Sequence, residues 1–167
     1  MDQVHGAGDV SSGTTHAIPT EIGEMTAVFV VGVAVIDFVL FVDAMPRKAE
    51  KYRAREAAIV GGGCAANAAV AVSRLGGTAM LAARLGDDRI ADMIVTDLEA
   101  DGVDCRLVRR FPGRASSFSS IFVDAAGERQ IVNFRDRDLD RSSKWLYDNF
   151  PKKASAALTR LPPSMYR

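Results

Sequence analysis

The stretch Gly-Gly-Gly-Cys-Ala-Ala-Asn-Ala-Ala-Val-Ala-Val-Ser-Arg-Leu, residues 61–75, decides how this chain folds. Its three consecutive glycines let a backbone approach a ligand closely, and the residues after them have mostly high helix propensity. The spacing predicts a helix over residues 64–75, entered from an apolar segment through a glycine turn. The first N–H groups of a helix lack partners within it, so this junction suits a polar ligand. The glycines alone are also compatible with a turn that only packs a helix against a sheet.

Two polar side chains favour a binding site over a packing turn. Asn67 stands one turn into an otherwise apolar helix, and its carboxamide can both donate and accept hydrogen bonds, as a sugar hydroxyl does. Asp37 interrupts the end of the first apolar segment, where open α/β sheets bind their ligands. Each has a purely structural alternative, local hydrogen bonding for Asn67 and a solvated salt bridge for Asp37. Together they predict a small-molecule site.

The order of the segments indicates an α/β fold with a parallel sheet. Residues 27–36 are almost continuously apolar, as in a strand covered on both faces. After the glycines, the pattern predicts strands over 78–83 and 103–108, with a helix between them that is capped by Asp87 or Asp88. Four more polar segments predict a small second sheet with one exposed face: residues 38–42, 53–59, 118–124 and 129–134. We expect the last two of these segments to form a hairpin.

The two ends of the chain differ from the body at residues 27–139. Residues 1–26 are polar, rich in Gly, Ser and Thr, and without periodicity, so we expect a disordered leader there, with Met25 as an alternative start. Residues 140–167 combine clustered basic residues with prolines, and we expect an atypical tail.

Composition excludes several classes of function. Lys plus Arg and Asp plus Glu both number 21, so no global charge favours nucleic acid or an anionic membrane. The longest apolar stretch is shorter than the roughly 20 residues that span a bilayer. Both histidines lie in the expected leader, which argues against triads and histidine metal sites. The isolated cysteines, Cys64 and Cys105, suit a reducing cytoplasm, and we expect both to be buried.

The segment Gly62-Gly63-Cys64-Ala65-Ala66-Asn67-Ala68-Ala69, followed by Gly76 and Gly86, resembles the first signature of the pfkB carbohydrate kinases. Further motifs are similar to the N-terminal half of that family, in the same order: Val31-Gly32 and Asp37, Arg84-Leu85-Gly86-Asp87-Asp88, Gly102-Val103-Asp104, and Gly127-Glu128-Arg129. The resemblance covers about residues 27–139. Within the family, Lys51-Tyr52 and the triple glycine look closest to ketohexokinase-like and sulfofructose kinase members.

The resemblance implies a ribokinase-like parallel sheet flanked by helices, with the small sheet as a lid that often pairs two subunits. It places the sugar hydroxyls on Asp37, Gly62, Gly63 and Asn67, and it offers Lys51 as a contact for an anionic group on the sugar. It also implies ATP and Mg²⁺ as cofactors, although no residue present is assigned to either.

The family's later half carries a Gly-Ala-Gly-Asp segment whose aspartate is the catalytic base, and no such segment follows Leu139. Gly6-Ala7-Gly8-Asp9 has those letters but precedes the first strand, so we interpret it as a coincidence. We therefore expect a truncated chain that lacks the catalytic base and the ATP site. Two other hypotheses remain open: a dinucleotide-binding module, because Gly61-x-Gly63-x-x-Ala66 fits a relaxed fingerprint, and a non-catalytic dimerising remnant.

Overall fold

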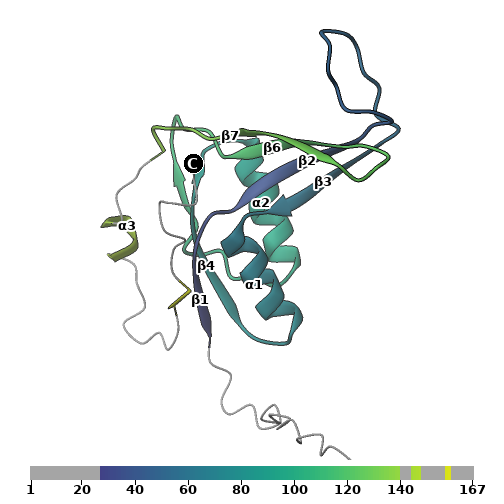
Figure 1. Cartoon of the computed structure of the whole chain (residues 1–167). Coiled ribbons are helices and arrows are strands. Elements are labelled where there is room, and N and C mark those ends of the chain that lie inside the picture. Colours follow the sequence, from purple (N-terminus) through teal and green to yellow (C-terminus); the bar gives the residue numbers. More distant parts are fainter. Residues whose placement is uncertain (1–26, 140–143, 148–156, 159–167) are drawn as a thin grey trace, which may run out of the picture.

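The computed structural model describes residues 27–139, 144–147 and 157–158. The expectations for the leader at 1–26, and for most of the tail at 140–167, lie outside these described residues. The described part contains two β-sheets, and two helices lie together on one face of the first sheet (Figure 1). These two helices span Cys64–Arg74 (α1) and Arg89–Ala100 (α2), and a third, short helix spans Lys144–Tyr147 (α3).

The first sheet is parallel, as the sequence predicted, and its strands follow the order β5-β4-β1-β8. Its strands span Val28–Gly32 (β1), Ala79–Gly86 (β4), Arg109–Phe111 (β5) and Ala157–Leu158 (β8). Neighbouring residues of β1 point to opposite faces, and both Phe29 and Val30 are buried, at 2% and 1% exposure. The strand is therefore covered on both faces at this point, which is why it is so uniformly apolar.

Small side chains bring α1 close to this sheet. Ala65, Ala66 and Ala69 are buried in the same core cluster as Val30 and Leu81. The contact is tight enough that a Cβ added to Gly32, at the end of β1, would lie 3.0 Å from the Cβ of Ala65. The alanine-rich composition of α1 thus sets how near its first turn lies to the carboxyl edge of the sheet.

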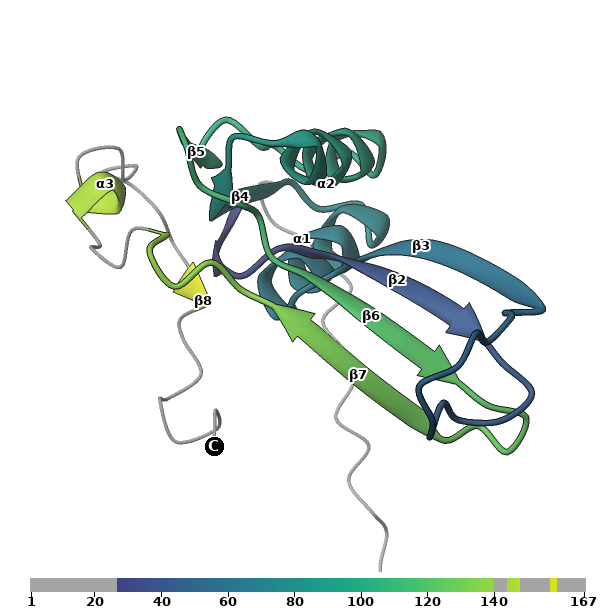
Figure 2. The same cartoon turned by 90° about the horizontal axis from the view of Figure 1, so that it is seen from above.

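The second sheet, here called the lid sheet, projects from the end of the first (Figures 1 and 2). Its strands follow the order β3-β2-β6-β7, with β2 and β6 parallel and both outer pairs antiparallel. The strands are Val35–Phe41 (β2), Glu56–Gly62 (β3), Phe118–Val123 (β6) and Arg129–Phe134 (β7). The predicted hairpin is present, because Gly127 takes a positive φ of 82° and donates to the Asp124 carbonyl at 3.0 Å.

The first apolar segment is two strands rather than one, and this corrects the sequence prediction. The chain leaves the parallel sheet after Gly32 and enters the lid sheet at Val35, so the lid strand is Val35–Phe41 and not 38–42. Likewise β3 covers Glu56–Gly62 instead of 53–59, so the first two glycines of the run end a strand. Because both sheets bury apolar side chains here, hydrophobicity cannot mark where the chain changes sheets.

Two further predictions were wrong. The segment 103–108 is not a strand, since only Asp104 bridges to Met80 and the strand begins at Arg109. The Asp104 carboxylate accepts from the backbone N–H of Arg106 at 3.0 Å, which turns the chain. Cys64 is exposed because it is the first residue of α1, whereas Cys105 is buried as expected.

Asp88 joins the main body to the start of the lid sheet. Its carboxylate caps α2 by accepting from the Ala91 N–H at 2.9 Å, and it also accepts from the N–H and hydroxyl of Ser116, both at 2.7 Å. Burial would raise the pKa of this carboxyl, but these hydrogen bonds and the charge of Arg110 outweigh it and lower the pKa below its ordinary value. The charged carboxylate therefore fixes α2 to the segment that leads into β6.

Candidate functional site

The triple glycine forms the junction between β3 and α1. Gly63 is the N-cap residue of α1 with φ 96°, and a Cβ on it would lie 2.4 Å from the carbonyl oxygen of Val33. That carbonyl accepts from the Ala66 N–H at 3.4 Å, and no side chain within the described residues caps the helix. The start of α1 therefore lies directly against Val33, in the segment where the chain crosses from the first sheet to the lid sheet. No side chain separates the two backbones at this point.

Asp37 and Gly62, two of the residues that the resemblance assigns to the sugar, lie in contact. In the β2–β3 register Gly62 pairs with Val35, and Asp37 is two residues further along β2 on the same face. A Cβ on Gly62 would lie 2.6 Å from the Asp37 Oδ2 atom. The carboxylate therefore lies over the Gly62 backbone, in a space that any side chain at position 62 would occupy.

Asn67 lies one turn along α1 from these glycines, and its side chain is exposed. Asn67, Gly61 and Gly62 line an open groove of about 480 Å³ that runs between α1 and α2. The groove also includes Arg74, whose guanidinium pairs with the Asp101 carboxylate at 2.9 Å. In the part of the chain that the structure describes, neither the Asn67 carboxamide nor the Asp37 carboxylate makes a hydrogen bond or ion pair. Gly62 thus lies against the Asp37 carboxylate and lines the groove together with Asn67, whereas Asp37 is not among the residues that line this groove.

Lys51 is not brought to this site. It is exposed and lies in the loop between β2 and β3, beyond the Phe41 end of the lid sheet (Figure 1). Because β2 has seven residues, this end lies roughly 20 Å from the Gly62 end of the sheet.

Sequence reasoning missed two polar residues of the lid sheet. Ser119 pairs with Asp37 in register, and Asn133 pairs with Ser119, so the three side chains form one row on one face. Ser119 is 6% exposed, and its hydroxyl lies 3.2 Å from the Asn133 Nδ2 atom. The hairpin register alone could have paired Ser119 with Asn133. Their alignment with Asp37 depends on the parallel β2–β6 contact, which no local pattern encodes.

The described residues contain no cluster of metal ligands, and the glycines do not fit a dinucleotide fingerprint. Among residues 27–139, 144–147 and 157–158, no group of three His, Cys, Asp or Glu side chains is placed to hold a metal ion. The dinucleotide fingerprint follows a strand of a parallel sheet, but here the glycines end β3, which runs antiparallel to β2 in the lid sheet.

Burial raises the pKa of the Cys105 thiol to about 11, with smaller contributions from Glu99 and Asp104, so this thiol stays protonated at neutral pH.

Within the described ranges, no helix is long and apolar enough to cross a membrane.

Comparison with known proteins agrees with this geometry. The family model described as "pfkB family carbohydrate kinase" matches residues 25–162, so the match extends beyond residue 139, where the resemblance read from motifs ends. Deoxyribokinase of Salmonella typhi is 29% identical over 122 residues, which are 69% of this chain and 40% of the relative. Ribokinase of Dictyostelium discoideum is 32% identical over 62% of this chain and 32% of its own, and fructokinase-1 of Zea mays is 38% identical over 47% and 24%.

Solved structures show the same partial likeness. Ribokinase of Thermotoga maritima superposes with a TM-score of 0.57 at 30% identity, over 65% of this chain and 36% of that one. Ribokinase of Arabidopsis thaliana, complexed with ribose and ATP, gives a TM-score of 0.60 at 23% identity, which supports the ribokinase-like fold alone. The chain therefore spans 40% or less of the length of these relatives and structures.

Proposed function

Because this chain belongs to the pfkB family of carbohydrate kinases, we propose that it forms the sugar-binding part of a kinase that phosphorylates a hydroxyl of a ketose or related sugar with ATP. The observation that carries the proposal is the Asp37 carboxylate, held over the Gly62 backbone and close to the start of α1. A carboxylate accepts hydrogen bonds from two hydroxyls at once, and the missing side chain at Gly62 leaves room for the carboxylate in this position. Asn67 then supplies a carboxamide that can both donate and accept hydrogen bonds. The close approach that Gly63 allows brings α1, which carries Asn67, to the site.

We further propose that these 167 residues do not transfer phosphate by themselves. Phosphoryl transfer needs a base for the attacking hydroxyl and positive groups around the phosphates. In the family the aspartate of a Gly-Ala-Gly-Asp segment is that base, and the sequence after Leu139 contains no such segment. The family uses ATP with Mg²⁺, and the described residues contain no group of three His, Cys, Asp or Glu side chains that could hold a metal ion.

The experiment is a titration of the ¹⁵N-labelled chain followed by amide NMR shifts, with a coupled assay for ADP. We expect fructose or ribose to shift the amides of Asp37 and of residues 61–67, and we expect ATP to leave them in place and to yield no ADP. Glycerol at the same concentration controls for weak polyol contacts. Shifts with NADH and none with either sugar would contradict the sugar site, and sugar-dependent ADP formation would contradict the inactivity of this chain.

The lid sheet supports a second proposal, that two copies of this chain pair through it. Ile59 and Val132 are 57% and 61% exposed, and the register places them on one face with Phe38. Phe118 and Phe134 lie on that same face with ring centroids 5.3 Å apart, and Phe134 is 42% exposed. Exposed apolar side chains on a sheet face favour association with an identical face in a two-fold dimer.

Light scattering tests this pairing. At about 100 µM we expect a mass near twice the 17.9 kDa of one chain, because burying this face removes apolar surface from water. Val132→Lys places a charge in the proposed interface and should give the monomer mass, whereas Thr96→Lys, on the exposed face of α2, should leave the dimer intact. A wild-type monomer at this concentration would rule the pairing out.

A further inference from the structure

The short segment at residues 114–116 joins the main body to the lid sheet and is held by two carboxylates. It leads from β5 into β6, which begins two residues after it. From the side of the main body, the Asp88 carboxylate accepts from the N–H and the hydroxyl of Ser116, both at 2.7 Å. From the other side, the Asp136 carboxylate accepts from the N–H of Ala115 at 3.0 Å. Two successive N–H groups of this segment are therefore bound by carboxylates from two different parts of the chain.

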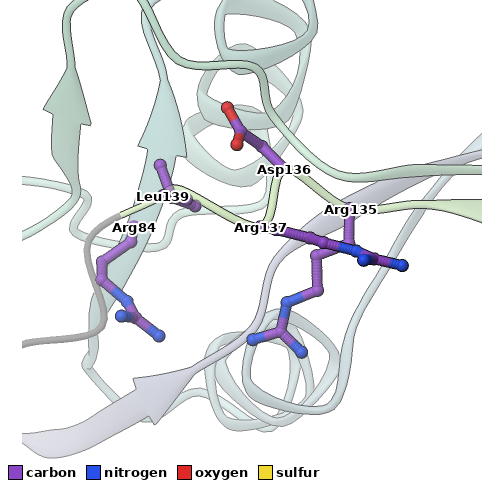
Figure 3. A pocket seen from close by; sticks show the side chains of 5 residues that line it. All are labelled: Arg84, Arg135, Asp136, Arg137 and Leu139. Atoms are coloured by element: carbon purple, nitrogen blue, oxygen red, sulfur yellow. The ribbon is translucent and has the colours of Figure 1, made fainter.

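Asp136 belongs to the segment that leaves the lid sheet, two residues after the end of β7. Its carboxylate also accepts from the N–H of Asp138 at 2.8 Å, and Figure 3 shows it pointing away from the guanidinium groups of Arg84 and Arg135. The backbone hydrogen bonds, above all the one from Ala115, lower the pKa of Asp136 below its ordinary value, so this side chain is charged at neutral pH. The chain thus enters and leaves the β6–β7 hairpin at one point, where a charged group joins the two passages.

The main body holds Ser116 closely. This residue is 1% exposed, and its hydroxyl accepts from the N–H of Gly86, the last residue of β4, at 3.0 Å. A Cβ on Gly86 would lie 2.6 Å from the Ser116 nitrogen, so the two backbones are in direct contact. The motif at residues 84–88 therefore forms the seat of the segment that carries the lid sheet. We call Asp88, Ser116 and Asp136 the lid clamp.

The lid clamp lies where it sets the relative position of two parts of the candidate sugar site. Asp37 belongs to the lid sheet and pairs in register with Ser119 of β6, three residues after Ser116. Asn67 belongs to α1, which packs on the main sheet. Groups on two separate bodies bind one ligand well only if the supporting contacts hold them in the productive geometry. The fit of the site therefore depends on the angle between the lid sheet and the main body.

We propose that Ser116 and Asp136 are positioning residues for the sugar site, which keep the lid sheet at the angle where Asp37 and Asn67 contact the same sugar. This inference rests on the proposed function, which supplies the sugar. The clamp suits the role because hydrogen bonds to a charged carboxylate are stronger than those between neutral groups. Without the Asp136 carboxylate, the lid sheet keeps only the attachment at Ser116. Sugar binding then weakens although every group that contacts the sugar is still present.

Asp136→Ala tests the inference, because Asp136 is only half-buried and the chain should fold without its carboxylate. In NMR titrations with fructose or ribose, we expect the affinity to fall about fivefold, the contribution of roughly one hydrogen bond. Asp136→Asn keeps an acceptor oxygen and should recover part of the loss. Residual dipolar couplings of the backbone amides give a readout that a merely stabilising role would not change. The couplings of the lid sheet should no longer fit its wild-type orientation relative to α1 and α2.

Asp124→Ala is the matched control. The Asp124 carboxylate also accepts from two backbone N–H groups, those of Ala126 at 2.9 Å and Glu128 at 3.0 Å, but it lies at the turn of the hairpin, at the other end of β6 from Ser116. This variant should keep the wild-type affinity and the wild-type lid orientation. Ser116→Ala removes only a hydroxyl of the clamp and should weaken sugar binding as Asp136→Ala does.

The outcomes separate the inference from the proposed function. Wild-type affinity in both Asp136→Ala and Ser116→Ala overturns the inference and leaves the proposed function standing. An equal loss in Asp124→Ala also overturns it, because any weakening of the hairpin would then act on the site. If far-UV circular dichroism shows that Asp136→Ala is unfolded, Asp136→Asn decides, with a smaller loss expected in the same direction. If the wild-type chain binds neither sugar, the proposed function and the inference fail together.

Discussion

Replacing Gly63 with alanine is expected to destabilise the chain by about 3–5 kcal/mol, because strain in the backbone and a steric clash add together. The residue has φ 96°, which an L side chain rarely adopts. Its new Cβ would lie 2.4 Å from the Val33 carbonyl oxygen and 3.0 Å from the Ala34 Cα, and neither backbone atom can rotate away. Urea denaturation followed by far-UV circular dichroism measures the loss. It would be a large part of the 5–15 kcal/mol that is typical of a whole domain.

Gly76→Ala separates the two causes. Gly76 also has a positive φ, 83°, but no atom lies within 4 Å of where its Cβ would be. This variant should therefore cost only the backbone strain, about 1–2 kcal/mol. If Gly63→Ala costs no more than Gly76→Ala, the close approach of α1 to the sheet crossover at Val33 is wrong.

The crossover between the two sheets shows what the sequence could not predict around the candidate site. Residue types and the resemblance assign Asp37 and Gly62 to a sugar site, and this role stays a prediction. The path of the chain between Gly32 and Val35 was misjudged, since every residue from Val28 to Ile36 except Gly32 is apolar and each sheet has its own buried side. Residue type indicates burial, but it does not indicate which of two sheets provides it.

Elsewhere too, contacts within one segment could be predicted from the sequence, whereas contacts between distant segments could not. The hairpin of β6 and β7 was predicted correctly because its turn, from Asp124 to Glu128, forms its own hydrogen bonds. The alignment of Ser119 with Asp37 joins segments far apart in sequence and could not be read from either segment. The false strand at 103–108 arose because Val103 and Cys105 are buried in a turn with the alternation of a strand.

Asp37→Asn is expected to weaken sugar binding by at least about tenfold, because an amide gives up the charge that strengthens each hydrogen bond to a hydroxyl. The variant keeps the shape of the side chain, and Asp37 makes no ion pair among the described residues, so the stability should change little. NMR titration with fructose measures the affinity. Asp43→Asn is the control, because Asp43 is 92% exposed beyond the Phe41 end of the same strand, and it should bind as the wild type does. An unchanged affinity in Asp37→Asn would remove the carboxylate from the site.

Gly62→Ala should reduce sugar binding for a related reason, although every charge stays in place. Its Cβ would lie 2.6 Å from Asp37 Oδ2, so the carboxylate must rotate away from the position in which it meets the sugar. If Gly62 acts through Asp37, the two substitutions are not additive, and the double variant Asp37→Asn with Gly62→Ala binds no more weakly than Asp37→Asn alone. Additive losses would instead mean that Gly62 contacts the sugar through its own backbone. The double-mutant cycle therefore decides whether the glycine provides space for the carboxylate or for the ligand.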